Sequence, residues 1–349
     1  MRVVVAGAGI GGLTTALSLH AAGITDVTVY EAVEEIRPLG VGINLLPPAV
    51  RALTELGLYD DLAEISVATA ELVRFDRRGS RVRSEPCGLD AGYDWPQFAV
   101  HRGELQMLLL RAQLAWLGAE SLRTGLRLTG YAQTADGVTV EFTDPAGDTV
   151  TDEADVLIAA DGINSAGRAL MYPNEGPAGR NGLVLWRGTS PAPAFLTGSS
   201  MIMAGDGEQR FVAYPIRAAE GERPALLTWI AERPLEGEPP ERGDWDRPVE
   251  LDTITRHFEE WDFDWLDVPS VIANADIAYE YPMLDREPLP SWSDGRVTLL
   301  GDAAHATFPI GSDGASQAIL DARVVARELA ARTDPVEALE AYEDLRRSA

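Results

Sequence analysis

Residues 2–23 read RVVVAGAGIGGLTTALSLHAAG, and the fold prediction starts from this stretch. The apolar run at residues 3–6 predicts a buried strand, which a glycine turn joins to a helix. The glycines Gly7, Gly9 and Gly12 have the spacing G-x-G-x-x-G. The first permits the tight turn, the second lets the backbone approach a pyrophosphate, and the third lets the helix pack against the strand. The N-terminus of the helix offers free N–H groups and a positive dipole end to phosphates.

A second predicted strand follows this helix and ends in an acidic residue. The segment DVTVYEA, residues 26–32, places Glu31 about 20 residues beyond the last glycine, where a carboxylate accepts from the ribose hydroxyls of a dinucleotide. Its negative charge disfavours a 2′-phosphate at this point. A glycine turn also occurs in ordinary strand–helix–strand units, but here strand, helix, second strand and terminal acid agree. We therefore predict a dinucleotide site that includes Gly7, Gly9, Gly12, Glu31 and Ala32.

The composition excludes several classes of protein. The 349 residues carry a formal net charge of −26, which repels nucleic acid and acidic membranes, so we expect neither as a partner. All 29 basic residues are arginine, which excludes Schiff-base chemistry and a Walker A loop. With one cysteine, Cys87, and four histidines that lack ligand spacing, we expect no internal disulfide and no metal site. No apolar run reaches the roughly 20 residues of a membrane helix, and we expect a cytoplasmic protein.

Three positions in the middle of the chain are candidate ligand contacts. Asp161 follows a predicted buried strand at residues 155–159, at the edge where ligands bind in open α/β sheets. Gly42 lies in a glycine-containing turn that lets backbone lie along a flat ring, although a plain loop fits the same letters. Arg102 begins a predicted helix, either as a solvated charge or as a guanidinium paired with phosphate.

The segment LLGDAAHATFPIGSDGASQAI, residues 299–319, has the residue order that a flavin requires. Asp302 ends a strand, and its carboxylate can accept from the polyol of a ribityl chain. A planar ring needs room beside bare backbone, and a helix that begins near such a ring directs its N-terminus at the negative edge of a reduced flavin. This helix dipole contributes about 0.3–1 kcal/mol. The residues predicted to border the ring are Pro309, Gly311, Gly314 and Ala315.

Between residues 181 and 281 the predicted structure changes. Runs such as GLVLWRG, RFVAYPI and ALLTWIAE predict strands of a separate sheet rich in aromatic residues. An aromatic layer over a nucleotide fold favours a pocket for a flat apolar ligand. For any single residue, an ordinary aromatic core is the simpler explanation.

Three motifs occur in order along the chain: GAGIGG…YEA, ADGINS and GDAAH…P…G. Together they resemble those of the flavoprotein aromatic hydroxylases, the group A single-component monooxygenases with the p-hydroxybenzoate hydroxylase fold. Other phrases, among them HRGELQM, AYPI and GASQAILDA, are most similar to the branch that contains 5-methylphenazine-1-carboxylate 1-monooxygenase. The resemblance covers nearly the whole chain and selects no single substrate.

The resemblance implies an α/β fold in which a Rossmann-like FAD-binding domain is interleaved with a smaller antiparallel-sheet substrate domain. We expect the FAD-binding domain at residues 1–70, 97–180 and 281–349, and the substrate domain at 71–96 and 181–280. The implied chemistry uses non-covalent FAD, NADH or NADPH as reductant without a separate nicotinamide domain, and oxygen. A small aromatic substrate is then hydroxylated through a flavin C4a-hydroperoxide. No side chain is expected to act as an essential acid or base, and we expect a monomer or homodimer.

The resemblance also implies roles for individual residues. Arg102 would lie near the pyrophosphate, and Asp161 belongs to a motif linked to both FAD and the pyridine nucleotide. Asp302 would bind the ribityl chain. We further take Arg187 as a candidate anchor for the substrate, and as candidate pocket walls Trp186, Met203, Tyr214 and Tyr281.

The chain departs from the family pattern at three places. Asn164 stands where relatives often carry histidine, and Asp313 stands where many carry asparagine. Just before a helix Asp313 is a good N-cap, but its charge close to the ring would oppose an anionic reduced flavin. Relatives also continue beyond YEDLRR with more helix, whereas this sequence stops at residue 349.

Other functions fit parts of the sequence. A halogenase or a dehydrogenase can be built on the same fold, but flavin halogenases use a pocket lysine, which this chain lacks. A non-catalytic flavin-binding module would hold FAD without substrate-stimulated turnover. Hydroxylation, epoxidation and Baeyer–Villiger insertion share these motifs, so the sequence leaves the choice among them open.

Overall fold

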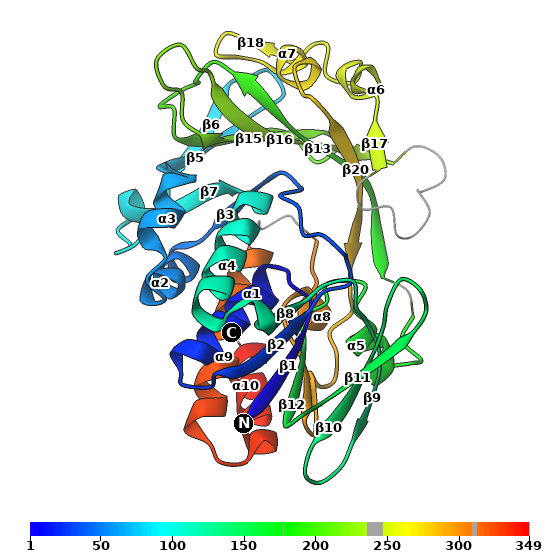
Figure 1. Cartoon of the computed structure of the whole chain (residues 1–349). Helices are drawn as coiled ribbons and strands as arrows, with labels where there is room; N and C mark the ends of the chain where they lie inside the picture. Colours follow the sequence, from blue (N-terminus) through cyan, green and yellow to red (C-terminus); the bar gives the residue numbers. More distant parts are fainter. Residues whose placement is uncertain (177, 236–246, 309–312, 349) are drawn as a thin grey trace.

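A six-stranded sheet forms the lower half of the molecule in the computed structural model, which describes residues 1–176, 178–235, 247–308 and 313–348 (Figure 1). All neighbouring strands are parallel except the edge pair β21–β22, and Val3 lies opposite both Val27 and Val156. The strands, in spatial order, are β21 (Ser293–Asp294), β22 (Val297–Leu299), β12 (Val156–Ala159), β1 (Arg2–Ala6), β2 (Asp26–Tyr30) and β8 (Leu122–Arg123).

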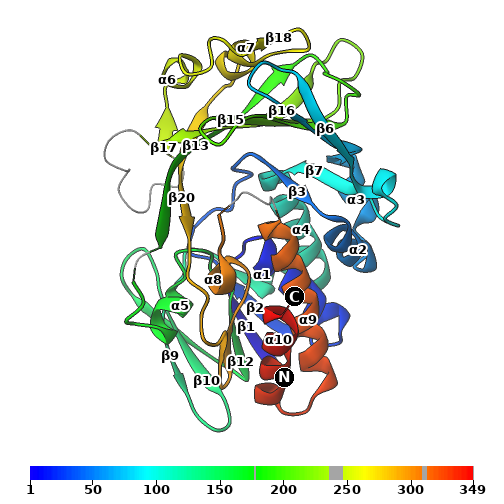
Figure 2. The ribbon, with the colours of Figure 1, turned by 180° about the vertical axis from the view of Figure 1, so that it is seen from behind.

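Both faces of this sheet are covered, which explains why its central strands are almost continuously apolar. Helices cover one face, and a three-stranded antiparallel sheet covers the other (Figures 1 and 2). The rings of Tyr30 and Phe142 stack at 3.9 Å between the two sheets. The covering elements are α1 (Ile10–Ala21), α4 (Arg102–Leu117), α9 (Gly314–Ala331) and α10 (Pro335–Arg347) on one side, and β9 (Arg127–Gln133), β10 (Val138–Thr143) and β11 (Thr149–Ala154) on the other.

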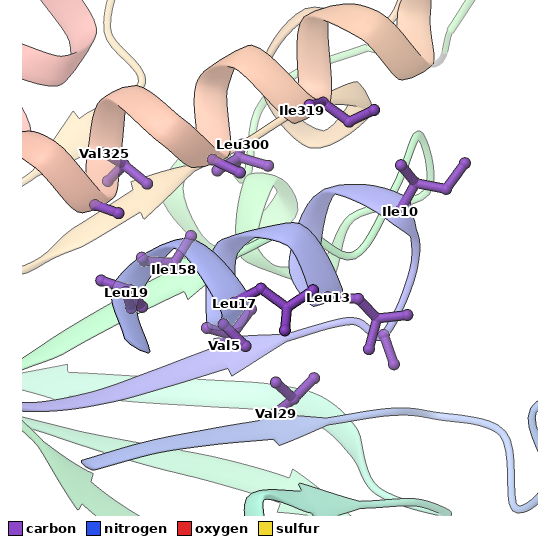
Figure 3. Packing of buried hydrophobic residues seen from close by; sticks show 14 of the residues in the cluster. Val5, Ile10, Leu13, Leu17, Leu19, Val29, Ile158, Leu300, Ile319 and Val325 are labelled. Atoms are coloured by element: carbon purple, nitrogen blue, oxygen red, sulfur yellow. The ribbon is translucent and has the colours of Figure 1, made fainter. Parts of the chain in front are cut away.

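The main core lies between the parallel sheet and helices α1 and α9. Figure 3 shows Leu13, Leu17 and Leu19 of α1 between strand residues and the side chains Ile319 and Val325 of α9. All five side chains are fully buried. Each such burial stabilises the fold by about 1.5–3 kcal/mol, and it fixes both helix N-termini at the same edge of the sheet.

An eight-stranded sheet forms the upper half (Figure 1). Its strands are antiparallel apart from the parallel pair β14–β5. In spatial order they are β17 (Arg247–Val249), β20 (Ala278–Asp285), β13 (Gly179–Ala192), β16 (Ala225–Pro234), β15 (Arg210–Arg217), β14 (Ser200–Gly205), β5 (Glu71–Phe75) and β6 (Arg81–Pro86).

The two faces of this upper sheet have different neighbours. Its outer face carries α6 (Leu251–Thr255), α7 (Val268–Ala273) and the hairpin of β18 (Asp262–Phe263) and β19 (Leu266–Asp267). Its inner face meets a small sheet and, beyond it, the lower half of the molecule. This region holds β3 (Gly42–Leu45), β4 (Ser66–Thr69), β7 (Gln97–His101), α2 (Pro47–Glu55) and α3 (Tyr59–Glu64).

The predicted domain boundaries can be set beside these elements. Strands β5 and β6 pair with the strands of residues 179–285, as the interleaved arrangement requires. Strand β20 starts in the predicted substrate domain and ends in the predicted FAD-binding domain, and Figure 2 shows it descending from the upper sheet toward α8 (Asp302–His305). The exact boundaries stay a prediction.

Two expectations from composition concern absences. Within the described ranges, no helix combines the length and apolar character needed to cross a bilayer. Among the same residues, no cluster of His, Cys, Asp and Glu is arranged to hold a metal ion.

Candidate active site

The glycine turn between β1 and α1 is tight enough to exclude side chains at two of its three glycines. Gly7 has φ +103°, and a Cβ there would lie 2.4 Å from the carbonyl oxygen of Ala160. A Cβ on Gly12 would lie 1.9 Å from the carbonyl oxygen of Gly7. A Cβ on Gly9, by contrast, would meet no atom within 4 Å. The fold itself therefore requires Gly7 and Gly12, whereas Gly9 leaves open space where a pyrophosphate would approach.

Glu31 lies beside this turn. Its Oε2 accepts from the backbone N–H of Ala8 at 2.8 Å, and its Oε1 accepts from the N–H of Val33 at 3.0 Å. These two bonds hold the carboxylate at the end of β2, next to the start of α1. Ala32 lies between Glu31 and its partner Val33. Each carboxylate oxygen keeps a free lone pair, so the side chain can still accept from ribose hydroxyls.

A cavity of about 510 Å³ extends from the glycine turn to the inner face of the upper sheet. We call it the cleft. The lower half of the molecule contributes the beginnings of α1, α4 and α9 and the α8 turn, and the upper sheet contributes side chains of β13, β15 and β16. Helix N-termini on one wall and a sheet on the other make this cleft suited to an anionic, flat ligand. The lining residues that matter below are Gly9, Arg102, Asp302, Gly314, Arg187 and Tyr214.

Asp302 opens onto the cleft from the α8 turn. Its carboxylate is exposed to the cleft and has no hydrogen-bond partner among the described residues, so it is open to a ligand. Partial desolvation by the cleft walls raises the pKa of Asp302, and the positive charges of His305 and Arg102 act in the opposite direction. A polyol hydroxyl at this position would satisfy the carboxylate.

Arg102 faces the same cleft from the first residue of α4. Its backbone N–H donates to the carbonyl of Val41 at 2.9 Å, while its guanidinium has no hydrogen-bond acceptor in the described part of the chain. An unpartnered carboxylate and an unpartnered guanidinium thus line one cavity beside an open glycine turn. This donor and acceptor set fits FAD, which carries ribityl hydroxyls next to a pyrophosphate.

The Asp161 carboxylate bonds to groups of its own turn and of the helix that follows. Its carboxylate accepts from the Ser165 hydroxyl, from the N–H of Ala166 at 2.7 Å and from the N–H of Gly167 at 3.2 Å. It therefore caps the N-terminus of α5 (Ala166–Met171) instead of facing the cleft. Burial raises the pKa of Asp161 although these bonds act to lower it. Its neighbours Ala160 and Gly162 line the cleft with backbone.

The predicted ring-bordering residues are only partly described. Pro309 and Gly311 lie outside the described residues. Gly314 and Ala315 line the cleft at the start of α9, and Asp313 at the N-cap position lines it too, without a capping side-chain hydrogen bond. The N-terminus of α9 therefore faces the cleft, as the sequence predicts.

On the upper wall, Arg187 and Tyr214 both contact the first residue of β3, Gly42. Arg187 Nη2 donates to the carbonyl of Gly42 at 3.0 Å, and the Tyr214 hydroxyl donates to the same carbonyl at 3.1 Å. The Tyr214 side chain is 1% exposed, and burial raises its pKa to about 12. The Arg187 guanidinium lies 5.5 Å from the ring centre of Tyr281, and its buried Nε has no partner among the described atoms. Gly42 thus connects the upper sheet to the lower half of the molecule through its backbone, and it does not line the cleft itself.

Trp186 is a correction to the sequence prediction. Successive residues of a strand point to opposite faces, so the neighbour of cleft-facing Arg187 faces the other way. Trp186 packs in the outer core under α6 and α7, where its Nε1 donates to Glu280 at 3.0 Å and its ring stacks on His257 at 5.8 Å. Met203 and Tyr281 lie on the inner face but outside the cleft lining, and the Met203 sulfur accepts from Arg74.

Sequence reasoning missed several cleft residues. His305 lines the cleft and belongs to the same GDAAH motif as Asp302, so the motif could have predicted it. Asn44, Phe308 and Arg346 also line the cleft. Nothing in the local sequence around Arg346 indicates that the end of α10 reaches a site built mainly from other parts of the chain.

Comparison with known proteins identifies the family. A family model described as an FAD binding domain matches residues 1–260 and 271–349. Phenazine 1,6-dicarboxylic acid hydroxylase PhzS of Lysobacter antibioticus is 47% identical over 99% of this chain and 86% of that protein. The FAD-dependent urate hydroxylase of Klebsiella pneumoniae subsp. pneumoniae is 32% identical over 98% of this chain and 85% of that protein.

The solved structures agree with the sequence relatives. The crystal structure of Klebsiella pneumoniae HpxO complexed with FAD and uric acid has a TM-score of 0.80 and 29% identity, over 99% of this chain and 84% of that one. The structure of CtdE in complex with FAD and a substrate has a TM-score of 0.82 at 20% identity, which supports the fold alone. The family match spans most of the sequence and the relatives align with nearly all of it, so this chain belongs to the family of FAD-dependent monooxygenases that hydroxylate aromatic compounds.

Proposed function

We propose that this enzyme hydroxylates a flat polycyclic aromatic acid of the phenazine carboxylate type, with NADH or NADPH as reductant. The observation that carries the proposal is the position of Arg187, whose guanidinium lines the cleft and has a buried Nε without a partner among the described atoms. A carboxylate is the natural partner for such a group. Similarity to the phenazine 1,6-dicarboxylic acid hydroxylase supports the ring class.

Different residues of the cleft would bind FAD and the substrate. Gly9, Arg102, Asp302 and the N-terminus of α9 would hold FAD, which supplies hydride acceptance and oxygen activation when bound. Arg187 would anchor the substrate acid, and the apolar side chains of Ile230 and Phe308 would pack against its ring and exclude water. No described side chain needs to act as an acid or base at the ring. We further propose a cytoplasmic monomer or homodimer.

The direct test is turnover of the FAD-loaded enzyme with NADH or NADPH, oxygen and a set of phenazines. Phenazine-1-carboxylate and phenazine-1,6-dicarboxylate should accelerate NAD(P)H oxidation and gain one oxygen atom by mass spectrometry, whereas unsubstituted phenazine should do neither. Arg187→Gln should raise KM for the acids about tenfold or more, the factor expected for loss of a charge-assisted hydrogen bond. The matched control is Arg74→Gln, because Arg74 lies exposed on the same sheet, away from the cleft.

Other outcomes distinguish the remaining functions. A product whose mass depends on chloride would indicate a halogenase, and oxidation of the substrate without oxygen gain would indicate a dehydrogenase. If FAD binds but no aromatic acid accelerates NAD(P)H oxidation, the proposed substrate class is wrong. An unchanged KM in Arg187→Gln would remove the anchoring role even if hydroxylation occurs.

A further inference from the structure

A buried carboxylate on α9 joins three separate elements beside the cleft. Asp321 is 0% exposed. Its Oδ2 accepts from the backbone N–H of Gly301 at 3.0 Å and is paired with Nε2 of His305 at 2.7 Å. Its Oδ1 accepts from Nε of Arg346 on α10 at 2.6 Å. Asp321 does not line the cleft, so its effect on a ligand there must pass through these partners.

Two of the partners of Asp321, Gly301 and His305, flank Asp302 along the chain. Gly301 directly precedes it and has φ +61°, and His305 is the last residue of the same four-residue turn. Within the turn, the N–H groups of Ala304 and His305 both donate to the carbonyl of Gly301. One helical turn is not stable by itself, so its orientation depends on contacts from outside. Asp321 supplies such contacts at both ends of the turn.

Two basic side chains, His305 and Arg346, pair with the Asp321 carboxylate. Burial lowers the pKa of His305, but the hydrogen bond and charge of Asp321 outweigh it, and the net shift is upward. The charged groups that face His305 are Asp321 from α9 and Asp302 from its own turn, while Arg346 from α10 bonds the other oxygen of Asp321. His305 and Arg346 thus pair with the two oxygens of Asp321, and the Asp302 carboxylate, which bonds neither of them, faces the cleft.

We propose that Asp321 is a positioning residue for FAD, which acts by holding Gly301 and His305 so that the Asp302 carboxylate faces the ribityl chain. The simpler alternative is a staple that only joins α8, α9 and α10. The two roles differ in what they predict for ligands. A staple affects every ligand through folding, whereas a positioning residue affects only ligands that Asp302 contacts. The inference concerns the cofactor and is independent of the substrate proposed above.

The test measures the affinity of the apoprotein for FAD and for ADP by calorimetry. ADP carries the pyrophosphate and adenosine but lacks the ribityl chain. Asp321→Asn should weaken FAD binding about tenfold or more, while ADP affinity should stay within about twofold. In a double-mutant cycle, Asp321→Asn should add less than about twofold to the loss caused by Asp302→Asn, because both act on the same contact.

The matched control is Glu328→Gln. Glu328 is a buried carboxylate on the same helix, paired with Arg327 and Arg332 about two turns beyond Asp321, and its loss should leave FAD affinity unchanged. Should Asp321→Asn fail to fold, His305→Gln replaces it in the same cycle, since it removes one of the two contacts and keeps the Gly301 bond. Equal losses for FAD and ADP, additive losses with Asp302→Asn, or an equal loss in Glu328→Gln would each overturn the proposal.

Discussion

Arg187 on the upper sheet donates a 3.0 Å hydrogen bond to the carbonyl of Gly42, the first residue of β3. Thr228 Oγ1 accepts from the N–H of the same residue at 3.0 Å, and Tyr214 donates to the same carbonyl. One peptide segment is thus held by three side chains from three strands of the upper sheet. At this point the two halves of the molecule are joined through the backbone N–H and carbonyl of Gly42.

Gly42→Ala should destabilise the protein. A Cβ at this position would lie 2.4 Å from Cγ2 of Thr228 and 2.6 Å from Cγ2 of Ile216, so these side chains or the strands that carry them must shift. Overpacking of this kind costs about 1–3 kcal/mol, which thermal unfolding would show as a lower Tm. Gly207→Ala is the control, since a Cβ there meets no atom within 4 Å. An unchanged Tm in Gly42→Ala would show that the two halves are not packed as closely as described.

The glycine turn should separate folding from cofactor binding. Alanine in a helix normally stabilises by about 0.5–1 kcal/mol relative to glycine, but in Gly12→Ala the 1.9 Å approach to the Gly7 carbonyl should reverse that sign and cause a loss of stability. Gly9→Ala should fold normally, because its Cβ points into open space, and should bind FAD less tightly. Chemical unfolding and FAD titration of the two variants test this. Equal FAD affinity in Gly9→Ala and wild type would place the pyrophosphate elsewhere.

Asp302→Ala should lower FAD affinity without harming the apoprotein. Because the Asp302 carboxylate is exposed and has no hydrogen-bond partner among the described residues, its removal should leave the Tm of the apoprotein close to the wild-type value. Loss of a charge-assisted bond to a ribityl hydroxyl costs about 1.5–3 kcal/mol, or roughly 10- to 150-fold in Kd. Flavin content after purification and the Kd of added FAD are the measurements. Wild-type flavin retention would refute the contact.

The pairing of His305 with Asp321 should make stability depend on pH. The pKa of His305 is raised in the folded state, so its contribution to stability is fully present below the unfolded value of about 6.5 and is lost as pH rises through the folded pKa. The free energy of unfolding from urea titrations should therefore fall over that interval. In His305→Gln this step should disappear. A step of the same size in both proteins would assign it to other groups.

Asp161→Ala should affect α5 more than the cofactor. The carboxylate caps the helix through Ser165 and the N–H groups of Ala166 and Gly167, and loss of a cap costs about 0.5–2 kcal/mol. The Tm should fall, while FAD affinity of the folded protein should change little. A large loss of FAD affinity at unchanged Tm would restore the direct cofactor role that the motif suggests.

Much of the cofactor site follows from local sequence. Gly7, Gly12 and Glu31 are decided by steric and hydrogen-bond requirements within about 30 residues, and a strand–turn–helix of this kind folds in one way wherever it occurs. The comparisons confirm the predicted family and fold. The local sequence also places Asp302 after a buried strand, and this first residue of α8 does open onto the cleft.

The opposite outcomes for neighbouring residues show what local sequence leaves undecided. The alternation of side chains along β13 predicts that Trp186 and Arg187 point to opposite faces of the sheet. It does not predict which face is which. Because α6 and α7 pack on one face, Trp186 lies in the core there and Arg187 lies at the cleft. Asp161 and Asp302 both follow a strand and precede a short helix. Asp161 caps its helix, whereas Asp302 lines the cleft, because the two turns differ in which N–H groups they present.

The sequence by itself determined the dinucleotide turn, the acid at the end of β2, the flavin motif order and the class of protein, since each depends on residues close together in the chain. Only the tertiary structure decided which face of the upper sheet meets the lower half of the molecule. It also decided that Asp321 of α9 reaches the Asp302 turn and that Arg346 of α10 bonds to Asp321. The physical reason is that period and spacing fix the direction of a side chain relative to its own element, whereas its partners depend on how distant elements pack.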